Sequence, residues 1–284
     1  MLVLESISAL RQTLRDWRSK GISVAFVPTM GNLHAGHVHL VREAKRVADR
    51  VVVSVFVNPT QFSPGEDFDA YPRTPAEDAE KLRGAETDLL FMPAAAELYP
   101  RGSDAATFVE VPGLSDELCG QFRSGHFRGV ATVVSKFFNL VQPDVALFGE
   151  KDFQQLMIIR RVVADLDFPV RIHAVATVRE PSGLAMSSRN AYLTAEQKAQ
   201  AARLYRCLCQ AAEAIGRGER DFEQIERQQV EALQAAGFRA DYFSIRRESD
   251  LAPAGQDDSD LVILAAAWLG KARLIDNIRV TRSR

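Results

Sequence analysis

The chain has 284 residues, 46% of them hydrophobic and 25% charged, which is typical of a folded globular protein and excludes a disordered or fibrous one. Its formal net charge of −2 provides no overall attraction for a polyanion, so a nucleic-acid substrate is not expected. Chains of this length usually form more than one domain, and we expect two.

The apolar runs and the cysteines give no sign of a membrane or secreted protein. Residues 1–21 include Glu5 and Asp16 and lack the apolar stretch of a signal peptide. No apolar run approaches the roughly 20 residues that cross a bilayer. Cys119, Cys207 and Cys209 cannot all pair, which fits a reduced compartment, and we assign none of them to a metal or to catalysis. The sequence therefore predicts a cytoplasmic protein.

The first 176 residues alternate apolar, β-branched runs with amphipathic stretches, which is the pattern of parallel strands joined by crossover helices. Strands are predicted over residues 22–27, 50–57, 88–92, 145–148 and 170–177. Helices are predicted over residues 37–49, 75–83, 129–141 and 153–166. This order predicts an α/β fold with a Rossmann-like, doubly wound parallel sheet.

The composition changes after Arg189, and a second domain is expected to follow. Thr194 is suited to cap an alanine-rich helix that runs to about residue 215. A second helix is predicted over 222–236, and strands over 240–246, 261–269 and 272–278, with Gly270 and Lys271 as a hairpin turn. We therefore predict a nucleotide- and substrate-binding domain over 1–176. A smaller α+β domain over 177–284 is expected to close over the active site.

A glycine-containing segment, PTMGNLHAGH, separates the strand predicted over 22–27 from the helix that follows it. Ligands of open α/β sheets bind at this carboxyl edge of the strands. Gly31 and Gly36 allow the backbone to approach a phosphate closely, and a helix N-terminus offers N–H groups and a positive dipole end. The segment therefore predicts a phosphate-binding loop.

His34 and His37 in this segment are three residues apart and share a helix face, so both side chains can donate hydrogen bonds to a phosphate in the transition state. An HxxH pair can also simply cap or pack a helix. A zinc site would need further ligands, and His126 and His173 lie in distant segments. Between glycines and directly after a strand, we interpret the pair as part of a nucleotide site.

The segment NPTQF follows the strand predicted over 50–57, again at the carboxyl edge. Gln61 can donate and accept hydrogen bonds, which suits a ligand with hydroxyls and a carboxylate. The alternative is a plain turn in which Pro59 ends the strand.

The segment GEKD follows the strand predicted over 145–148 and opens another helix. Lys151 at this position can lie against phosphates, Asp152 can cap the helix, and Gln155 lies one turn further on. An ordinary surface lysine remains the alternative.

The segment MSSRN lies where the composition changes between the two expected domains. Two hydroxyls, their backbone N–H groups and a guanidinium in one short run can hold a phosphate, and a junction loop can move over a substrate. A simple turn is the alternative. If the segment binds phosphate, we expect Lys151 and Arg189 on opposite walls of the site.

Taken together, four blocks resemble the pantothenate synthetase family in their order along residues 28–193. They are PTMGNLHAGH, VNPTQFSPGEDFDAYPRT, GHFRGVATVVSKFFNLVQPDVALFGEKDFQQL and GLAMSSRNAYL. The resemblance is loose beyond about residue 195. It implies a HIGH-motif nucleotidyltransferase fold in which the HxGH sequence stands for the HIGH box and MSSRN for a KMSKS-like loop. Ser182 and His39 depart from the usual pattern, without touching a residue that is given a role.

The resemblance also implies the site residues. His34, His37, Lys151 and Arg189 would be catalytic, with His37 as proton donor, and Gln61 and Gln155 would bind pantoate, with Gln61 near the β-alanine position. The implied ATP contacts are Met30, Gly31, Asn32, Leu33, His34, Ala35, Gly36, His37, Gly149, Glu150, Lys151, Asp152, Val178, Met186, Ser187, Ser188 and Arg189.

The implied activity is the ATP-dependent ligation of pantoate to β-alanine through pantoyl adenylate, with Mg²⁺ on the departing pyrophosphate, by a homodimer that meets no nucleic acid or membrane. Metal ligands are unknown. Glu77 and Asp78 are conceivable, but surface carboxylates that open a helix are the preferred interpretation. Three rivals are a nucleotidyltransferase that keeps the nucleotide on its product, a noncatalytic nucleotide-binding module, and an aminoacyl-tRNA synthetase, which the acidic charge balance disfavours.

Overall fold

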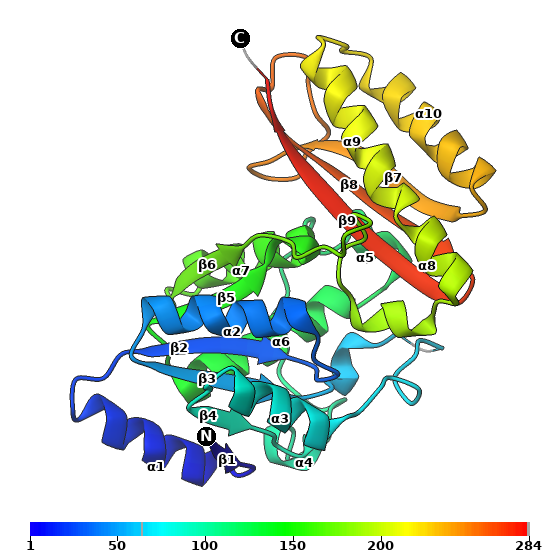
Figure 1. The fold of residues 1–284 in the computed structure, drawn as a ribbon. Coiled ribbons are helices and arrows are strands. Elements are labelled where there is room, and N and C mark those ends of the chain that lie inside the picture. The colour runs from blue at the N-terminus through cyan, green and yellow to red at the C-terminus, as the bar shows by residue number, and fades with distance from the viewer. Residues whose placement is uncertain (64, 283–284) are drawn as a thin grey trace. The chain divides into compact units, whose positions relative to one another are not determined.

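The computed structural model describes residues 1–63 and 65–282, and the chain divides into two compact units (Figure 1). The first unit consists of Met1–Glu150 and Gln155–Ala176, and the second of Lys151–Gln154 and Thr177–Arg284. No helix among the described residues is long and apolar enough to cross a membrane.

The first unit is built on a six-stranded parallel sheet in the order β1-β4-β3-β2-β5-β6. Its strands are β1 (Leu2–Leu4), β2 (Val24–Thr29), β3 (Arg50–Val55), β4 (Leu89–Phe91), β5 (Val145–Gly149) and β6 (Arg171–Val175). The chain runs outward from β2 through β3 to β4, and then returns to the other side of β2 with β5. The predicted doubly wound sheet is confirmed, and its order reverses between β2 and β5, where ligands of such sheets bind.

The helices of this unit cover both faces of the sheet because every central strand is apolar on both sides. Val24 and Phe26 of β2 pack with α1 (Ile7–Arg18), α6 (His126–Val141) and α7 (Phe153–Asp165). Ala25 and Val27 of the same strand pack with α2 (Ala35–Val47) and α3 (Pro75–Gly84) on the opposite face. This alternation is the period of two that a strand imposes. Short helices are η1 (Pro59–Gln61), α4 (Ala95–Leu98), α5 (Cys119–Phe122) and η2 (Glu150–Asp152).

The second unit is a small α+β structure around one apolar core. An antiparallel sheet in the order β7-β8-β9 joins β7 (Arg239–Arg247), β8 (Asp260–Leu269) and β9 (Ala272–Thr281). Gly270 and Lys271 form the predicted two-residue turn, with Gly270 at φ 57°. The helical elements are η3 (Ser188–Tyr192), α8 (Ala195–Ala201), α9 (Arg203–Gly216) and α10 (Phe222–Ala235).

Three local features differ from the expectation. Strand β1 and helix α1 were not predicted, although Leu10 and Leu14 of α1 are fully buried in the core. The alanine-rich helix is divided at Ala202 into α8 and α9, without a glycine or proline to signal the break, while Thr194 caps α8 as predicted. Helix α2 begins at Ala35 instead of His37, because His34 serves as its N-cap.

The close packing of α6 on η1 yields a prediction for Gly129. A Cβ atom at Gly129 would collide with the carbonyl oxygen of Thr60 and lie 2.6 Å from Gln61 Cα. Gly129→Ala should therefore destabilise the protein by about 1–3 kcal/mol, the usual range for overpacking, and displace Gln61. Urea unfolding measures the loss.

The control is Gly84→Ala at the end of α3, where a Cβ atom meets nothing within 4 Å. That substitution should be neutral or stabilise by up to about 1 kcal/mol. Equal stability of both variants would show that α6 can move away from η1 at no cost.

Candidate active site

The loop between β2 and α2 has a backbone that only small or flexible residues adopt easily. Gly31 and Asn32 lie in the left-handed region, at φ 87° and 49°. A Cβ atom at Gly31 would lie 3.0 Å from Val55 Cγ1 and 3.1 Å from Asp78 Oδ2. The absence of a side chain thus lets the loop pass close to β3 and α3. The loop lies at the carboxyl end of β2, beside the reversal of the sheet order.

Asp78 of α3 holds this loop through its backbone. Its side chain is fully buried, and its two oxygens accept the N–H groups of Asn32 at 2.9 Å and Leu33 at 2.7 Å. From the next turn of α3, Lys81 Nζ donates to the carbonyl oxygen of Leu33 at 2.8 Å. The interpretation of Asp78 as a surface carboxylate is therefore wrong, whereas Glu77, with 69% of its side chain exposed, is one. Asp78 therefore positions the loop from α3, by accepting two of its backbone N–H groups.

His34 and His37 form a reciprocal cap at the start of α2. Gly36 donates its backbone N–H to His34 Nδ1 at 3.1 Å, and His34 donates its own to His37 Nδ1 at 3.3 Å. The two rings lie 4.1 Å apart between centroids. Because each Nδ1 accepts a hydrogen bond, each neutral ring carries its proton on Nε2. The capping interpretation is thus observed. The cap uses only Nδ1 of each ring, so it does not compete with a phosphate-binding role of Nε2.

Gln61 lies at the end of η1, where its side chain contacts another predicted site residue. It is 6% exposed, and its Nε2 lies 2.8 Å from Met30 Sδ of the β2–α2 loop. Asn58 Nδ2 donates to Gln61 Oε1 at 3.2 Å and to the carbonyl oxygen of Gly129 at 3.1 Å. Burial raises the pKa of Tyr99, whose protonated hydroxyl donates to Asn58 Oδ1 at 2.9 Å. The NPTQF turn therefore presents Gln61 in a fixed position.

A buried histidine that the sequence does not place in the site, His126, contacts the backbone of Gln61. His126 Nδ1 lies 2.7 Å from the carbonyl oxygen of Gln61, and its Nε2 lies 2.9 Å from Arg123 Nη1. A carbonyl only accepts and a guanidinium only donates, so Nδ1 carries the proton and the ring is neutral. Arg123 is held in turn by a two-bond ion pair with Glu66, at 2.7 and 2.9 Å. His126 is the first residue of α6, and Arg123 follows α5 as its C-cap. Neither residue carries a local pattern that points to Gln61.

Lys151 and Gln155 lie on either side of the start of α7. Lys151 is the middle residue of η2, and its Nζ lies 3.6 Å from Asp152 Oδ2. Asn277 Nδ2 of β9 donates to the carbonyl oxygen of Lys151 at 2.9 Å. The compact units divide here, with Lys151–Gln154 in the second and Gln155 in the first.

A tight hairpin brings Val178 next to the MSSRN segment. Met186 donates its N–H to the carbonyl oxygen of Val178 at 3.0 Å, and Arg179 and Ala185 form a bridge below it. Ser187 caps η3, with its Oγ accepting the N–H of Arg189 at 3.2 Å. Lys151 and Ser187 line one small hollow of this unit together with Asp276.

The predicted site residues therefore fall into two sets, one in each compact unit. The first holds the β2–α2 loop, Gln61 and Gln155, and the second holds Lys151, Val178 and residues 186–189. Lys151 was expected on the N-terminal domain, on the wall opposite Arg189. It lies in the same unit as Arg189.

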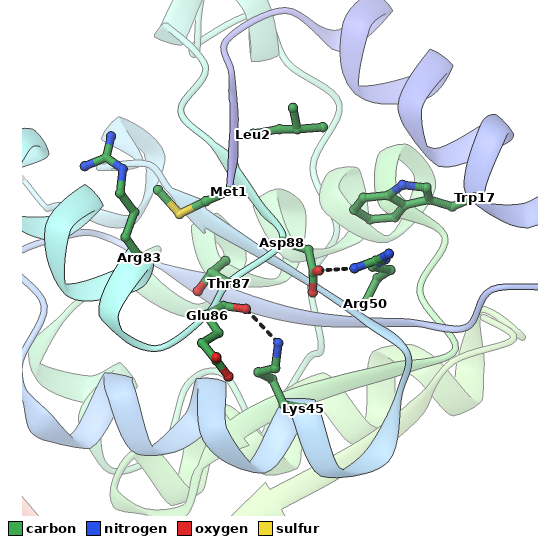
Figure 2. A pocket seen from close by; sticks show the side chains of 9 residues that line it. All are labelled: Met1, Leu2, Trp17, Lys45, Arg50, Arg83, Glu86, Thr87 and Asp88. Atoms are coloured by element: carbon green, nitrogen blue, oxygen red, sulfur yellow. Dashed lines mark hydrogen bonds and ion pairs between the residues drawn. The ribbon is translucent and has the colours of Figure 1, made fainter.

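A larger hollow of about 590 Å³ lies elsewhere in the first unit (Figure 2). It opens at the amino-terminal ends of the strands, where Arg50 of β3 pairs with Asp88 at 2.6 Å and Lys45 donates to the carbonyl oxygen of Glu86 at 2.7 Å. Its lining residues are Met1, Leu2, Trp17, Lys45, Arg50, Arg83, Glu86, Thr87 and Asp88. None of them belongs to the predicted site, and the β2–α2 loop and Gln61 follow the opposite, carboxyl ends of β2 and β3.

Comparison with known proteins gives one consistent result. The family model described as pantoate-beta-alanine ligase matches residues 2–279. A pantothenate synthetase of Methylococcus capsulatus is 62% identical over 281 residues, which are 99% of this chain and 98% of the relative. The crystal structure of pantothenate synthetase from Thermus thermophilus is 46% identical, with a TM-score of 0.91 over 98% of this chain and 99% of that one. The Francisella tularensis ligase, crystallised with βγ-ATP and β-alanine, is 33% identical, with a TM-score of 0.80 over 98% and 97%.

The buried carboxylate of Asp78 yields a prediction for the β2–α2 loop. Asp78→Asn replaces one accepting oxygen by an NH₂ group that faces a backbone N–H. It should cost about 1–3 kcal/mol of unfolding free energy, because a buried donor then lacks its acceptor. Urea unfolding at pH 7 measures the loss.

The exposed neighbour Glu77 provides the control for this variant. Its nearest cation, Lys81 Nζ, is 4.0 Å away, so Glu77→Gln should change the unfolding free energy by less than about 0.5 kcal/mol. Unchanged stability of Asp78→Asn would mean that the loop does not need the carboxylate.

Proposed function

Because this chain belongs to the pantoate-β-alanine ligase family, we propose that it condenses pantoate with β-alanine, in a reaction driven by conversion of ATP to AMP and pyrophosphate. The product is pantothenate, the precursor of coenzyme A. The assignment of the site depends mainly on the geometry of the β2–α2 loop. Two Nε2–H donors, fixed by the cap, stand there at the reversal of a doubly wound sheet.

In the first step, a carboxylate oxygen of pantoate attacks the α-phosphorus of ATP. The bond from that phosphorus to the bridging oxygen of the β-phosphate breaks, and pyrophosphate departs with the electron pair. His34 and His37 donate through Nε2 to the oxygens of the crowded phosphorus, where negative charge increases. Lys151 and Arg189 offset the charge of the phosphates. Pantoyl adenylate is the product of this step.

In the second step, the amine of β-alanine attacks the acyl carbon of the adenylate. The amide bond forms, AMP leaves, and the amine loses a proton. Water would hydrolyse the mixed anhydride, so the site has to exclude water while the intermediate exists. We propose that residues 1–176 bind the nucleotide and pantoate, and that residues 177–284 close over them.

We propose that Gln61 and Gln155 recognise pantoate. An amide side chain can donate to the carboxylate and exchange hydrogen bonds with the hydroxyls of this acid. The fixed position of Gln61, between Asn58 and the carbonyl contact with His126, supports a role in which the side chain is oriented before the substrate arrives.

Mg²⁺ is expected to enter as the complex with ATP, since this ion keeps several waters and binds mainly phosphate oxygens. It would supply positive charge to the triphosphate. Among residues 1–63 and 65–282, no group of three or more histidine, cysteine or acidic side chains is placed to hold a metal ion. We therefore assign it no protein ligand. The homodimer and the cytoplasmic location stay predictions.

The activity itself is tested by omitting each substrate in turn. We expect AMP release to require ATP, pantoate and β-alanine, and pyrophosphate to form from ATP and pantoate alone in a single turnover. Quenched-flow measurement of both products separates the two steps. A pyrophosphate burst that requires β-alanine would exclude the adenylate, and pyrophosphate without AMP would indicate a nucleotidyltransferase.

The two roles of His37 can be separated by substitution. His37→Asn retains an acceptor near the position of Nδ1, so the cap should persist, but it removes the Nε2 donor. Turnover should fall by roughly 10²–10³, as for the loss of an oxyanion donor, whereas His37→Ala should also lose about 1 kcal/mol of stability with the cap. Steady-state rates and thermal unfolding measure both effects.

His39, two residues further along α2, provides a control because it takes no part in the cap. His39→Asn should retain both turnover and stability. Normal turnover of His37→Asn would reduce the role of His37 to that of a cap.

A further inference from the structure

Within the second unit, the main chain of Lys151 is bound to β9. Asn277 of β9 donates its Nδ2–H to the carbonyl oxygen of Lys151 at 2.9 Å, and Asn277 is 7% exposed. The carbonyl precedes the peptide that leads into α7, so this bond fixes the backbone from which the lysine side chain extends. The bond does not involve the Lys151 side chain, whose Nζ lies 3.6 Å from Asp152 Oδ2.

The preceding residue of β9 binds a second segment of the proposed ATP site. Arg179 pairs with Asp276 through two bonds, Nη1 to Oδ2 at 2.6 Å and Nη2 to Oδ1 at 2.9 Å. The Asp276 side chain is 3% exposed and that of Arg179 is 19% exposed. Asn277 donates its N–H to Asp276 Oδ1 at 2.8 Å, and the Arg179 guanidinium lies 3.6 Å from the centre of the Tyr205 ring. A planar fork with a stacked face is a geometry that lysine cannot reproduce.

Arg179 lies in the hairpin that carries the rest of this set. It follows Val178, bridges to Ala185 and donates from Nη1 to the carbonyl oxygen of Gly183 at 3.1 Å. The hairpin ends at Met186, which is bonded to Val178 and leads directly into residues 187–189. Two consecutive residues of β9 therefore bind the Lys151 peptide and the hairpin that leads to Arg189.

Burial raises the pKa of Asp276, while the Arg179 guanidinium and the Asn277 N–H act in the opposite direction. A buried charge is retained where such partners compensate its desolvation. Asp276 and Arg179 form such a compensated pair. Both side chains also bind the backbone: Arg179 donates to the carbonyl oxygen of Gly183, and Asp276 accepts the N–H of Asn277. Such contacts hold neighbouring segments in place.

We propose that Arg179, Asp276 and Asn277 are positioning residues that hold Lys151 and residues 178–189 on one frame. Lys151 and Arg189 then keep a constant spacing and act on the phosphates as a pair. This inference rests on the proposed function, in which both side chains bind phosphate. It adds that their alignment depends on two consecutive residues of β9, Asp276 and Asn277.

The frame is tested through the two half-reactions of Asn277→Leu, a variant of similar size that lacks the donor to Lys151. Single-turnover formation of pantoyl adenylate from ATP and pantoate should slow about 10- to 100-fold, the range expected for a displaced catalytic group. The attack of β-alanine on supplied pantoyl adenylate should change less than about threefold, because the pyrophosphate has already left. KM for ATP should rise more than KM for pantoate. Arg179→Lys should show the same pattern.

The matched control is another buried ion pair of the same sheet. Arg273 Nε of β9 donates to Asp241 Oδ2 of β7 at 2.8 Å, with side chains 11% and 3% exposed. Asp241→Asn should lower the melting temperature by an amount comparable to Asn277→Leu but leave the ratio of the two half-reaction rates unchanged. If Asn277→Leu fails to fold, Asn277→Ala, which adds no atoms to the site, is measured in its place.

The outcomes separate this inference from the proposed function. Slow adenylate formation with normal acyl transfer in the Asn277 variant, but not in Asp241→Asn, supports the frame. Equal slowing of both half-reactions, or no slowing, overturns it. A wild-type protein that forms no AMP overturns the proposed function and the frame with it. A Lys151→Ala variant that forms the adenylate at the normal rate overturns the phosphate role of Lys151, and hence the frame, but leaves the ligase activity intact.

Discussion

A buried carboxylate outside the loop holds the turn at the end of the central strand in the first unit. Gly31 and Asn32 have left-handed backbones, so their segment cannot satisfy its N–H groups by strand or helix pairing. Asp78 provides the acceptors from α3, 45 and 46 residues further along the chain. The N-cap residue His34 and the first turn of α2 come directly after this segment, so its conformation sets where the helix begins. The β2–α2 loop thus depends on the packing of α3 against the sheet.

The second unit uses an acidic side chain in a similar way. Asp276 lies on β9, remote in sequence from the hairpin that contains Arg179, and meets it through a two-bond ion pair. Neither acidic residue is assigned to the substrate. In both units a carboxylate that is shielded from water holds a segment that is distant in sequence.

Helices and strands could be predicted where the apolar pattern of a single segment was sufficient to identify them. Val51, Val52 and Val53 are apolar on both faces of β3, and the helices α3, α7 and α10 agree with the predicted ranges within one or two residues. Strand β1 has three residues and is largely exposed, so its pairing with β4 depends on neighbours and not on its own pattern. The division at Ala202 likewise has no local cause, because Ala202 remains near helical geometry, at φ −59° and ψ −15°.

By itself, the sequence determined the fold class, the family and the segments that bear the chemistry, because glycines, capping residues and apolar periods act over a few neighbouring positions. Only the tertiary structure decided which residues support those segments. Asp78 resembled any acidic residue in the first turn of a helix, and His126, Asp276 and Asn277 carried no pattern of their own. Their roles arise from contacts across 45 to 126 positions of the chain. Such contacts leave no local period in the sequence, since they are made by folding two distant elements against each other.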